Sequence, residues 1–473
     1  MPDSALQIDA ENASAISLNK AHWVLPDPDI SEVERIVRLH EVPEIVARLL
    51  VVRGIKEPQV QSFLHPTLKE HFPNPKNLQG MEAMAKDVAS AIMKGENFAI
   101  FGDFDVDGAT SSATLHRFLK RCGIDAPIYI PGRLTEGYGP NIEALTQLKE
   151  QGADILFLLD CGTTAFETVK AGTELGLKII IVDHHEAEDT LPECWHIINP
   201  KRKDDQSGLD MLAAVGVTYL ACVAINAQLR ELGFFEGRTP ANLKSLLDIV
   251  ALGTVCDMVP LTSANRLFVR HGFKIMANSD NVGLRNLIEV SRISGEITPY
   301  HAGFVLGPRI NAGSRVHKSE LGAELLSIDD PQRANEIAWT LSDCNDKRKD
   351  IQSTMEATAI HKVEDFALDQ KPLIFVEDES FHQGLSGLVA GRLKEKYKKP
   401  AIVVTYAENG AGVIEGRGSG RSVPGIHIAQ AFIDARNEGL ILKGGGHAMA
   451  GGFTLEPDKL EAFKEFLYDH IAQ

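Results

Sequence analysis

Short, uninterrupted apolar runs alternate with helical stretches between Asn97 and Ile198, and this rhythm limits the possible folds more than any other feature. Runs that are apolar throughout, rather than at every second residue, predict strands buried on both faces. Helical stretches between such strands predict right-handed crossovers and a parallel sheet. The predicted strands are Phe98–Phe101, Pro127–Ile130, Ile155–Leu159, Lys178–Val182 and His196–Ile198, and the helical stretches between them include Ser111–Arg121, Asn141–Glu150 and Glu167–Leu175.

A second alternation follows Pro372, after a long helix for which we expect Asp329 or Asp330 as the cap and Pro331 at the first position. We therefore predict an α/β protein of two α/β domains, the first with a mainly parallel sheet, joined by a long helix with a cleft between them. Its predicted parts are a disordered tail (1–20), a helical region with the first α/β domain (21–325), the connecting helix (326–366) and a C-terminal domain (367–473). In the last, we expect strands at Leu373–Val376 and Ala401–Thr405, a helix at Leu385–Tyr397, and glycine-rich turns at Glu415–Gly425 and Lys443–Gly452.

Charge and cysteine content narrow the class of protein. With 48 Lys and Arg against 65 Asp and Glu, the net charge of −17 argues against a protein that coats polyanions generally, although a local basic groove remains compatible. The sequence has no apolar run long enough for a membrane span and no signal-peptide pattern at its start. The 6 cysteines form no CxxC pair, which predicts reduced thiols in a cytoplasmic protein.

Acidic residues and histidines follow the predicted strands. Asp103, Asp105 and Asp107 follow the first strand, Asp160 ends the third, and Asp183-His184-His185 follows the fourth. From Leu212 to about Val255 the pattern is again helical. Its apolar last part, Leu246–Val255, leads into Asp257, which we count as a fourth site on the same sheet edge. In an open parallel sheet, ligands bind beyond the carboxyl ends of the strands.

Carboxylates this close together repel one another unless a cation neutralises them. Oxygen ligands with one or two imidazoles suit Mn²⁺ or Mg²⁺ better than structural Zn²⁺. Two such ions about 3.5–4 Å apart are a common arrangement for phosphoester hydrolysis. The Asp-x-Asp-x-Asp-Gly run also resembles the start of a calcium loop, but its twelfth position is Thr114 rather than Glu.

The segments FGDFDVDGATSS, LDCGTT, VDHHE and CDMVPL, in this order, resemble the four motifs of the DHH phosphoesterase family. PGRLTEGYG, GPRINAG, FHQGLSGLVAGRL, GRGSGRSVPG and GGGHAMAGGF resemble the RecJ-type single-stranded-DNA exonucleases. The resemblance covers about Trp23 to Phe453.

The resemblance implies a role for each site residue. One metal ion would be held by Asp103, Asp105 and Asp160, and the other by Asp107, Asp160, His184 and Asp257, with Asp160 bridging the two. As catalytic residues it implies His185, near the scissile phosphate, and Asp183, which would support the histidines. It favours Arg133 and Arg309 for a terminal 5′-phosphate, adds Ser419 and His447, and includes Arg315 although Asn311–Arg315 departs from the family's usual run.

The implied activity is 5′→3′ degradation of single-stranded DNA to mononucleotides with two Mn²⁺ or Mg²⁺ ions, in DNA repair and recombination. The implied partners are single-stranded DNA with a 5′ end, a helicase and a single-strand-binding protein, and we expect a monomer with no membrane contact. Bacterial RecJ-type chains usually continue into an OB-fold. Since this sequence stops after one closing helix, we expect a catalytic core with weak, salt-sensitive DNA binding.

Other functions stay open at this stage. A DHH phosphodiesterase acting on short oligonucleotides or cyclic dinucleotides is the main alternative, although such chains generally lack the N-terminal helical region and GPRINAG. A related pyrophosphatase would begin its first motif with a histidine, which is absent here. A non-catalytic DHH scaffold of a replication complex would have lost metal ligands, whereas every ligand position here carries a competent residue.

Overall fold

The first domain is built on a five-stranded sheet of order β2-β1-β3-β4-β5, in which every neighbouring pair is parallel. The computed structural model describes residues 26–409 and 412–472, so the predicted tail at 1–20 lies outside the described residues. The strands are β1 (Phe98–Gly102), β2 (Ile128–Tyr129), β3 (Ile155–Leu159), β4 (Lys178–Val182) and β5 (His196–Ile198). The parallel sheet predicted from the continuous apolar runs is confirmed, with strand ends within two residues of those expected.

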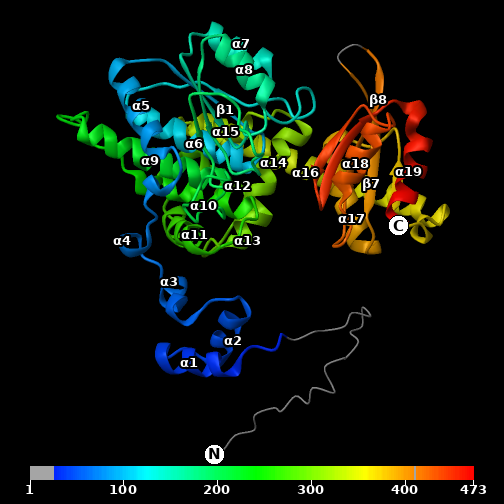
Figure 1. The fold of residues 1–473 in the computed structure, drawn as a ribbon, viewed down its shortest axis with the longest axis horizontal. Helices are drawn as coiled ribbons and strands as arrows, with labels where there is room; N and C mark the ends of the chain where they lie inside the picture. Colours follow the sequence, from blue (N-terminus) through cyan, green and yellow to red (C-terminus); the bar gives the residue numbers. More distant parts are fainter. Residues whose placement is uncertain (1–25, 410–411, 473) are drawn as a thin grey trace, which may run out of the picture.

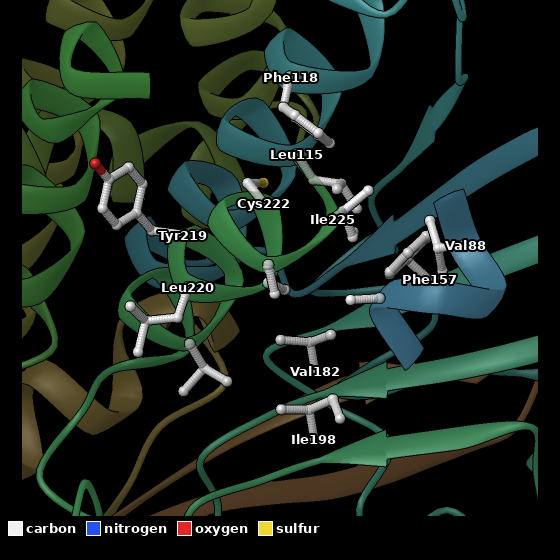
Figure 2. Packing of buried hydrophobic residues seen from close by; sticks show 14 of the residues in the cluster. Val88, Leu115, Phe118, Phe157, Val182, Ile198, Tyr219, Leu220, Cys222 and Ile225 are labelled. Atoms are coloured by element: carbon white, nitrogen blue, oxygen red, sulfur yellow. The ribbon is translucent and has the colours of Figure 1, made fainter. Parts of the chain in front are cut away.

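Helices cover both faces of this sheet (Figure 1). On one face lie α5 (Met81–Lys94), α6 (Val106–Arg121) and α9 (Ala214–Glu231), and on the other lie α7 (Ile142–Glu150) and α8 (Phe166–Glu174). Figure 2 shows the first layer: Val88 and Ile225 approach Phe157, Val182 and Ile198 from above the strands. Because strands buried on both faces need apolar side chains at every position, this packing explains the uninterrupted runs.

A second group of helices packs beside α6 and completes the first domain. Its members are α10 (Leu247–Cys256), α11 (Ser263–Met276), α12 (Val282–Val290), α13 (Pro299–His301), α14 (Gly307–Val316) and α15 (Leu321–Ser327), with the π-helix η5 (Ala302–Leu306) between α13 and α14. The Leu246–Val255 segment is thus mostly helix, so Asp257 does not follow a strand as its placement on the sheet edge had assumed. The helical pattern predicted from Leu212 to about Val255 is therefore confirmed, and only the grouping of Asp257 with residues that follow strands was wrong.

The long helix α16 (Pro331–Asp365) joins the two domains (Figure 1). Its N-cap is Asp330, whose side chain accepts hydrogen bonds from the backbone N–H groups of Gln332 and Arg333 as expected. The second sheet has the order β6-β7-β8-β10-β9 and is mixed, because only β6 and β7 are parallel. The remaining elements are β6 (Ile374–Glu377), α17 (Ser386–Tyr397), β7 (Ala401–Glu408), β8 (Ile414–Arg421), α18 (Ile428–Asn437), β9 (Lys443–His447), β10 (Ala450–Leu455) and α19 (Leu460–Ala472).

The two glycine-rich segments predicted as turns are strands, and that prediction was wrong. Gly416–Arg421 belongs to β8, whose backbone groups pair with β7 and β10, so it does not form the anion-binding nest that its composition allowed. The glycines make room for neighbouring side chains: a Cβ atom on Gly420 would lie 2.6 Å from Ile428, and one on Gly418 would overlap the Phe453 ring. These glycines are therefore explained by close packing against neighbouring side chains, and not by a turn of the chain.

The N-terminal helices form a small unit with its own core of Val33, Ile36, Ala47, Leu50 and Val60, apart from the sheet (Figure 1). They are α1 (Ile30–His40), α2 (Glu44–Val52) and α3 (Val60–Leu64). The short helix α4 (Leu68–His71) instead lies against α11, and its Leu68 packs on the core of the first domain. Within the described ranges, no helix is both long enough and apolar enough to cross a membrane.

Candidate metal centre

Three of the predicted ligands lie at the carboxyl ends of β1 and β3, which are neighbours in the sheet. From these two strands the chain continues toward opposite edges of the sheet. A sheet of order 2-1-3-4-5 has its binding crevice at this switch point. Asp103, Asp105 and Asp160 offer oxygen atoms that all lie within 4.8 Å of one another. Asp105 also caps α6 by accepting hydrogen bonds from the N–H groups of Asp107 (2.8 Å) and Gly108 (3.1 Å). Asp160 adopts a left-handed conformation with φ of 61°, a strained backbone that often marks a functional site.

A second group joins Asp107, His184 and Asp257, again with ligand atoms within 4.8 Å. The Asp107 carboxylate accepts hydrogen bonds from the N–H groups of Ala214 (2.7 Å) and Val215 (2.9 Å), at the N-terminus of α9. Asp257 is the C-cap of α10. Asp257 therefore reaches the site from the end of a helix, whereas we had grouped it with residues that follow strands.

The tautomer of His184 follows from one contact. Its Nδ1 donates to the Leu212 carbonyl at 3.1 Å, since a carbonyl can only accept. The neutral ring then has a lone pair on Nε2, which lies 3.4 Å from Asp160 and 3.6 Å from Asp257. Burial, followed by the charge of His185, lowers the pKa of His184 to about 4, so it is neutral at physiological pH. Neutral imidazole is the form that binds metals.

His185 is hydrogen-bonded to Asp183, and it also forms a third possible ligand group with Asp160 and His184. Its Nδ1 donates to Asp183 at 2.7 Å, and Asp183 also accepts from the hydroxyl of Thr163 at 2.6 Å. Burial opposes the charged imidazole, but the hydrogen bond and charge of Asp183 outweigh it and raise the pKa of His185. Burial likewise opposes ionised Asp183, but the contacts with His185 and Thr163 hold its pKa below the usual range. The hydrogen bond between them therefore favours the ionised form of both groups.

The remaining carboxylates lack such compensation. Burial, followed by the negative charge of Asp105, raises the pKa of Asp103 to about 8 and that of Asp257 to about 7. Burial and neighbouring carboxylates also raise the pKa values of Asp107 and Asp160 well above normal. One buried oxygen each of Asp103, Asp160 and Asp257 has no hydrogen-bond partner among the described residues. Buried, mutually repelling oxygens with unused lone pairs fit a divalent cation site.

A cavity of about 1020 Å³ opens between the two domains beside this centre. Three predicted phosphate residues line it, namely Arg133, Arg315 and Ser419. Arg133 also stacks over Phe104, with 4.5 Å between its guanidinium carbon and the ring centroid, and it interacts with the charges of Asp103 and Asp105. Burial, followed by the charge of Arg133, lowers the pKa of Arg315 to about 9. Crowded cations of this kind favour binding of an anion.

Two predicted phosphate residues are not among those that line the cavity. Arg309 donates from Nη1 to the Val305 carbonyl at 2.8 Å, and His447 is an exposed residue at the end of β9. Their phosphate roles stay predictions. Sequence reasoning missed Arg417 and Arg421, which line the cavity from β8 on either side of Ser419.

Tyr138 is a further residue that the sequence did not single out. Its hydroxyl donates to the Asp160 carbonyl at 3.2 Å and lies 3.3 Å from Nδ1 of His185. It also lines the cavity, so it connects the metal centre to the arginines. It belongs to PGRLTEGYG, a segment quoted for its resemblance, and only the folded chain identifies which of its residues faces the site.

Comparison with known proteins agrees with this geometry. Residues 97–254 match the model of the DHH family, N-terminal domain, and residues 370–473 match that of the DHHA1 domain. The single-stranded-DNA-specific exonuclease RecJ of Dickeya dadantii is 34% identical over 443 residues, which are 91% of this chain and 75% of the relative. This chain belongs to the RecJ family. The RecJ protein of Escherichia coli is 35% identical over 435 residues, 90% of this chain and 74% of that protein.

Solved RecJ structures share the fold. RecJ from Thermus thermophilus in complex with Mn²⁺ superposes with a TM-score of 0.79 at 27% identity, covering 95% of this chain and 62% of that chain. An exonuclease RecJ bound to manganese gives a TM-score of 0.71 at 29% identity, covering 84% of this chain and 95% of that one. The family resemblance seen in the sequence motifs is confirmed, as is the two-domain α/β fold.

Proposed function

We propose that this RecJ-family chain is a metal-dependent exonuclease that degrades single-stranded DNA from its 5′ end to mononucleotides. One observation carries the proposal: two groups of metal-type ligands meet beside an arginine-lined cavity. Such a layout allows a phosphodiester to lie at the carboxylates while a terminal phosphate occupies the cavity. The preference for single strands is supported by the names of the RecJ relatives.

Mn²⁺ or Mg²⁺ is the proposed cofactor, because RecJ structures contain one or the other and because the donors here are oxygens with one imidazole. Asp103, Asp105 and Asp160 would hold one ion, and Asp107, Asp160, His184 and Asp257 the second. When bound, such ions make water more acidic and neutralise negative charge that develops on the phosphodiester.

The protein's own contribution is positioning and proton control. Asp183 orients His185 and favours its cationic form, since it raises the pKa of that imidazole. A cationic imidazole beside the carboxylates can stabilise the phosphorane-like charge and can release its proton to a departing oxygen. Tyr138 limits the movement of this ring through its contact with Nδ1. Asp183 therefore acts through His185 rather than on the substrate.

Digestion of a 5′-phosphorylated single strand tests this function. We expect mononucleotides to accumulate from the 5′ end in Mn²⁺ or Mg²⁺, no products with excess chelator, and little digestion of the blunt duplex. Cleavage of dinucleotides with no cleavage of a strand of about 50 nucleotides would instead favour the phosphodiesterase for short substrates. Attack from the 3′ end would contradict the proposal. The proposed setting is DNA repair and recombination in the cytoplasm.

Arg421→Ala should remove the preference for a phosphorylated 5′ end. A charge-assisted hydrogen bond to a buried anion contributes about 1.5–3 kcal/mol, so we expect the rate ratio of 5′-phosphate to 5′-hydroxyl strands to fall about 10- to 100-fold. Steady-state kcat/KM on the two strands measures this ratio. Arg392→Ala is the matched comparison, because Arg392 is exposed on α17 and is not among the residues that line the cavity. Equal losses for both variants would argue against the cavity as the terminal-phosphate site.

A further inference from the structure

Two aromatic rings lie stacked and exposed on the surface of the first domain. The centroids of Tyr300 and Phe304 are 5.2 Å apart with 27° between the ring planes, and these residues are 63% and 71% exposed. Single exposed aromatic residues are common, but two stacked rings that both face solvent form a flat apolar surface that water covers poorly. Such a surface is suited to a flat, apolar ligand.

The local backbone holds both rings outward. Thr298 and His301 form a capping box at the start of α13, and the π-helix η5 follows directly. Ala302 and Leu306 are fully buried in the core beneath, so Tyr300 and Phe304 occupy the opposite side of these turns. Single π-helical turns are rare and occur frequently at functional sites.

This surface is fixed to the segment that carries a metal-type ligand. The Sγ of Cys256 donates to the Ala302 carbonyl at 3.4 Å, and a Cβ atom on Gly303 would lie 3.8 Å from Val255. The residues that follow α10 are Asp257, of the second ligand group, and Met258. Met258 is 84% exposed and has a left-handed φ of 62°. The aromatic pair therefore packs against the end of α10 that supplies Asp257.

The two sides of the metal centre differ in chemistry. Arg133, in the cavity, interacts with Asp103 and Asp105 of the first ligand group. Asp257, in the second group, is followed in the chain by Met258 and stands at the end of α10 against which the aromatic pair packs. Arg309 lies one turn beyond Phe304, with Nη1 bonded to the Val305 carbonyl and a buried Nε that has no hydrogen-bond partner within the described ranges. The arginines that favour anions thus lie on the side of the first ligand group. The exposed aromatic pair and Arg309 lie on the side of Asp257.

We propose that Tyr300 and Phe304 form a stacking surface for the bases of the DNA strand on the 3′ side of the scissile phosphate. The inference rests on the proposed function, because a strand whose 5′ phosphate occupies the arginine cavity must leave the carboxylates on the Asp257 side. Stacking on aromatic rings is tolerant of sequence, as an exonuclease requires. Met258 extends the apolar surface toward the metal centre, and Arg309 supplies positive charge for the strand's phosphates.

Kinetics on strands of two lengths test the proposal. In a Tyr300→Ala/Phe304→Ala variant, we expect KM for a strand of about 40 nucleotides to rise about tenfold or more, since each stacked base contributes that order of affinity. KM and kcat for a 5′-phosphorylated trinucleotide, which is too short to reach the rings, should not change. Phe304→Trp should keep the long-strand KM within about twofold of the unmodified protein. Phe366→Ala is the matched control, because Phe366 is 69% exposed at the end of α16.

A second readout separates this inference from the proposed function. Strands carrying one 2-aminopurine at successive positions are titrated onto the protein in chelator, where they are not hydrolysed. Quenching at internal positions that is lost in the double variant supports the stacking surface even if digestion fails for other reasons. Unchanged quenching and unchanged long-strand KM would overturn it, as would equal weakening on both lengths, which would indicate distortion of the metal centre. A protein that digests no single strand at all would instead refute the proposed function.

Discussion

An Asp160→Asn variant should lose at least about a thousandfold in kcat on single-stranded DNA. Asp160 belongs to the first ligand group, and its carboxylate also lies 3.4 Å from Nε2 of His184 in the second, so we expect its loss to weaken the holding of both proposed ions. Metal ions supply several kcal/mol of charge stabilisation in a phosphoryl transition state, and about 4 kcal/mol corresponds to a thousandfold. Single-turnover digestion at saturating Mn²⁺ measures the effect. Asparagine is chosen over alanine because it tolerates the left-handed backbone that Asp160 adopts.

The same variant has an opposite effect on metal-free stability. Because burial and neighbouring carboxylates raise the pKa of Asp160, its ionised form costs free energy in the folded protein. We expect Asp160→Asn to raise the melting temperature in chelator while reducing the further rise that Mn²⁺ causes. Asp210→Asn, at an exposed position, should change neither quantity nor kcat. Full nuclease activity in Asp160→Asn would contradict the proposed site.

The first domain could be predicted closely from the sequence because its physical causes are local. Five mainly apolar strands separated by helical stretches allow few arrangements other than a parallel sheet covered on both faces, and ligands then gather at one edge. Asp103 and Asp160 are far apart in sequence, but β1 and β3 are neighbours in exact register, from Phe98 opposite Ile155 to Gly102 opposite Leu159. The pairing of β1 with β3 was therefore enough to predict that these two acids lie close together.

The second domain and the cavity depend on contacts that no local pattern encodes. The glycines of β8 are explained only by Phe453 and Ile428, which come from later elements that pack against them. Arg417 reaches across the domain boundary and donates to the Leu134 carbonyl at 3.2 Å, a contact between residues 283 positions apart. The sequence could show that GRGSGR was unusual, but not that a strand would present its arginines beside Arg133. Asp257 shows the same limit, since a helical pattern alone does not tell where the end of α10 lies relative to the sheet.

The metal-free protein should become less stable as pH rises from about 5.5 to about 8. The pKa of Asp103 is raised to about 8 and that of Asp257 to about 7, by burial and then by the charge of Asp105, from an ordinary value of 3.8. Between the ordinary and the raised pKa, the folded state binds more protons than the unfolded state, so the free energy of unfolding falls as pH increases. We expect a loss of at least about 2 kcal/mol, or about 5 °C in melting temperature, measured by thermal unfolding in chelator.

Divalent metal should reverse this slope. Carboxylates must lose their protons to bind an ion, so the stabilisation by Mn²⁺ should increase across the same pH window, while His184 contributes no proton release because its pKa is already lowered to about 4. An Asp103→Asn/Asp257→Asn variant should show both a flatter metal-free profile and little response to Mn²⁺. A metal-free melting temperature that rose between about pH 5.5 and about pH 8 would mean that these carboxylates are already neutralised by the protein. The argument for a cation site from their burial and mutual repulsion would then fail, whatever the activity of the enzyme.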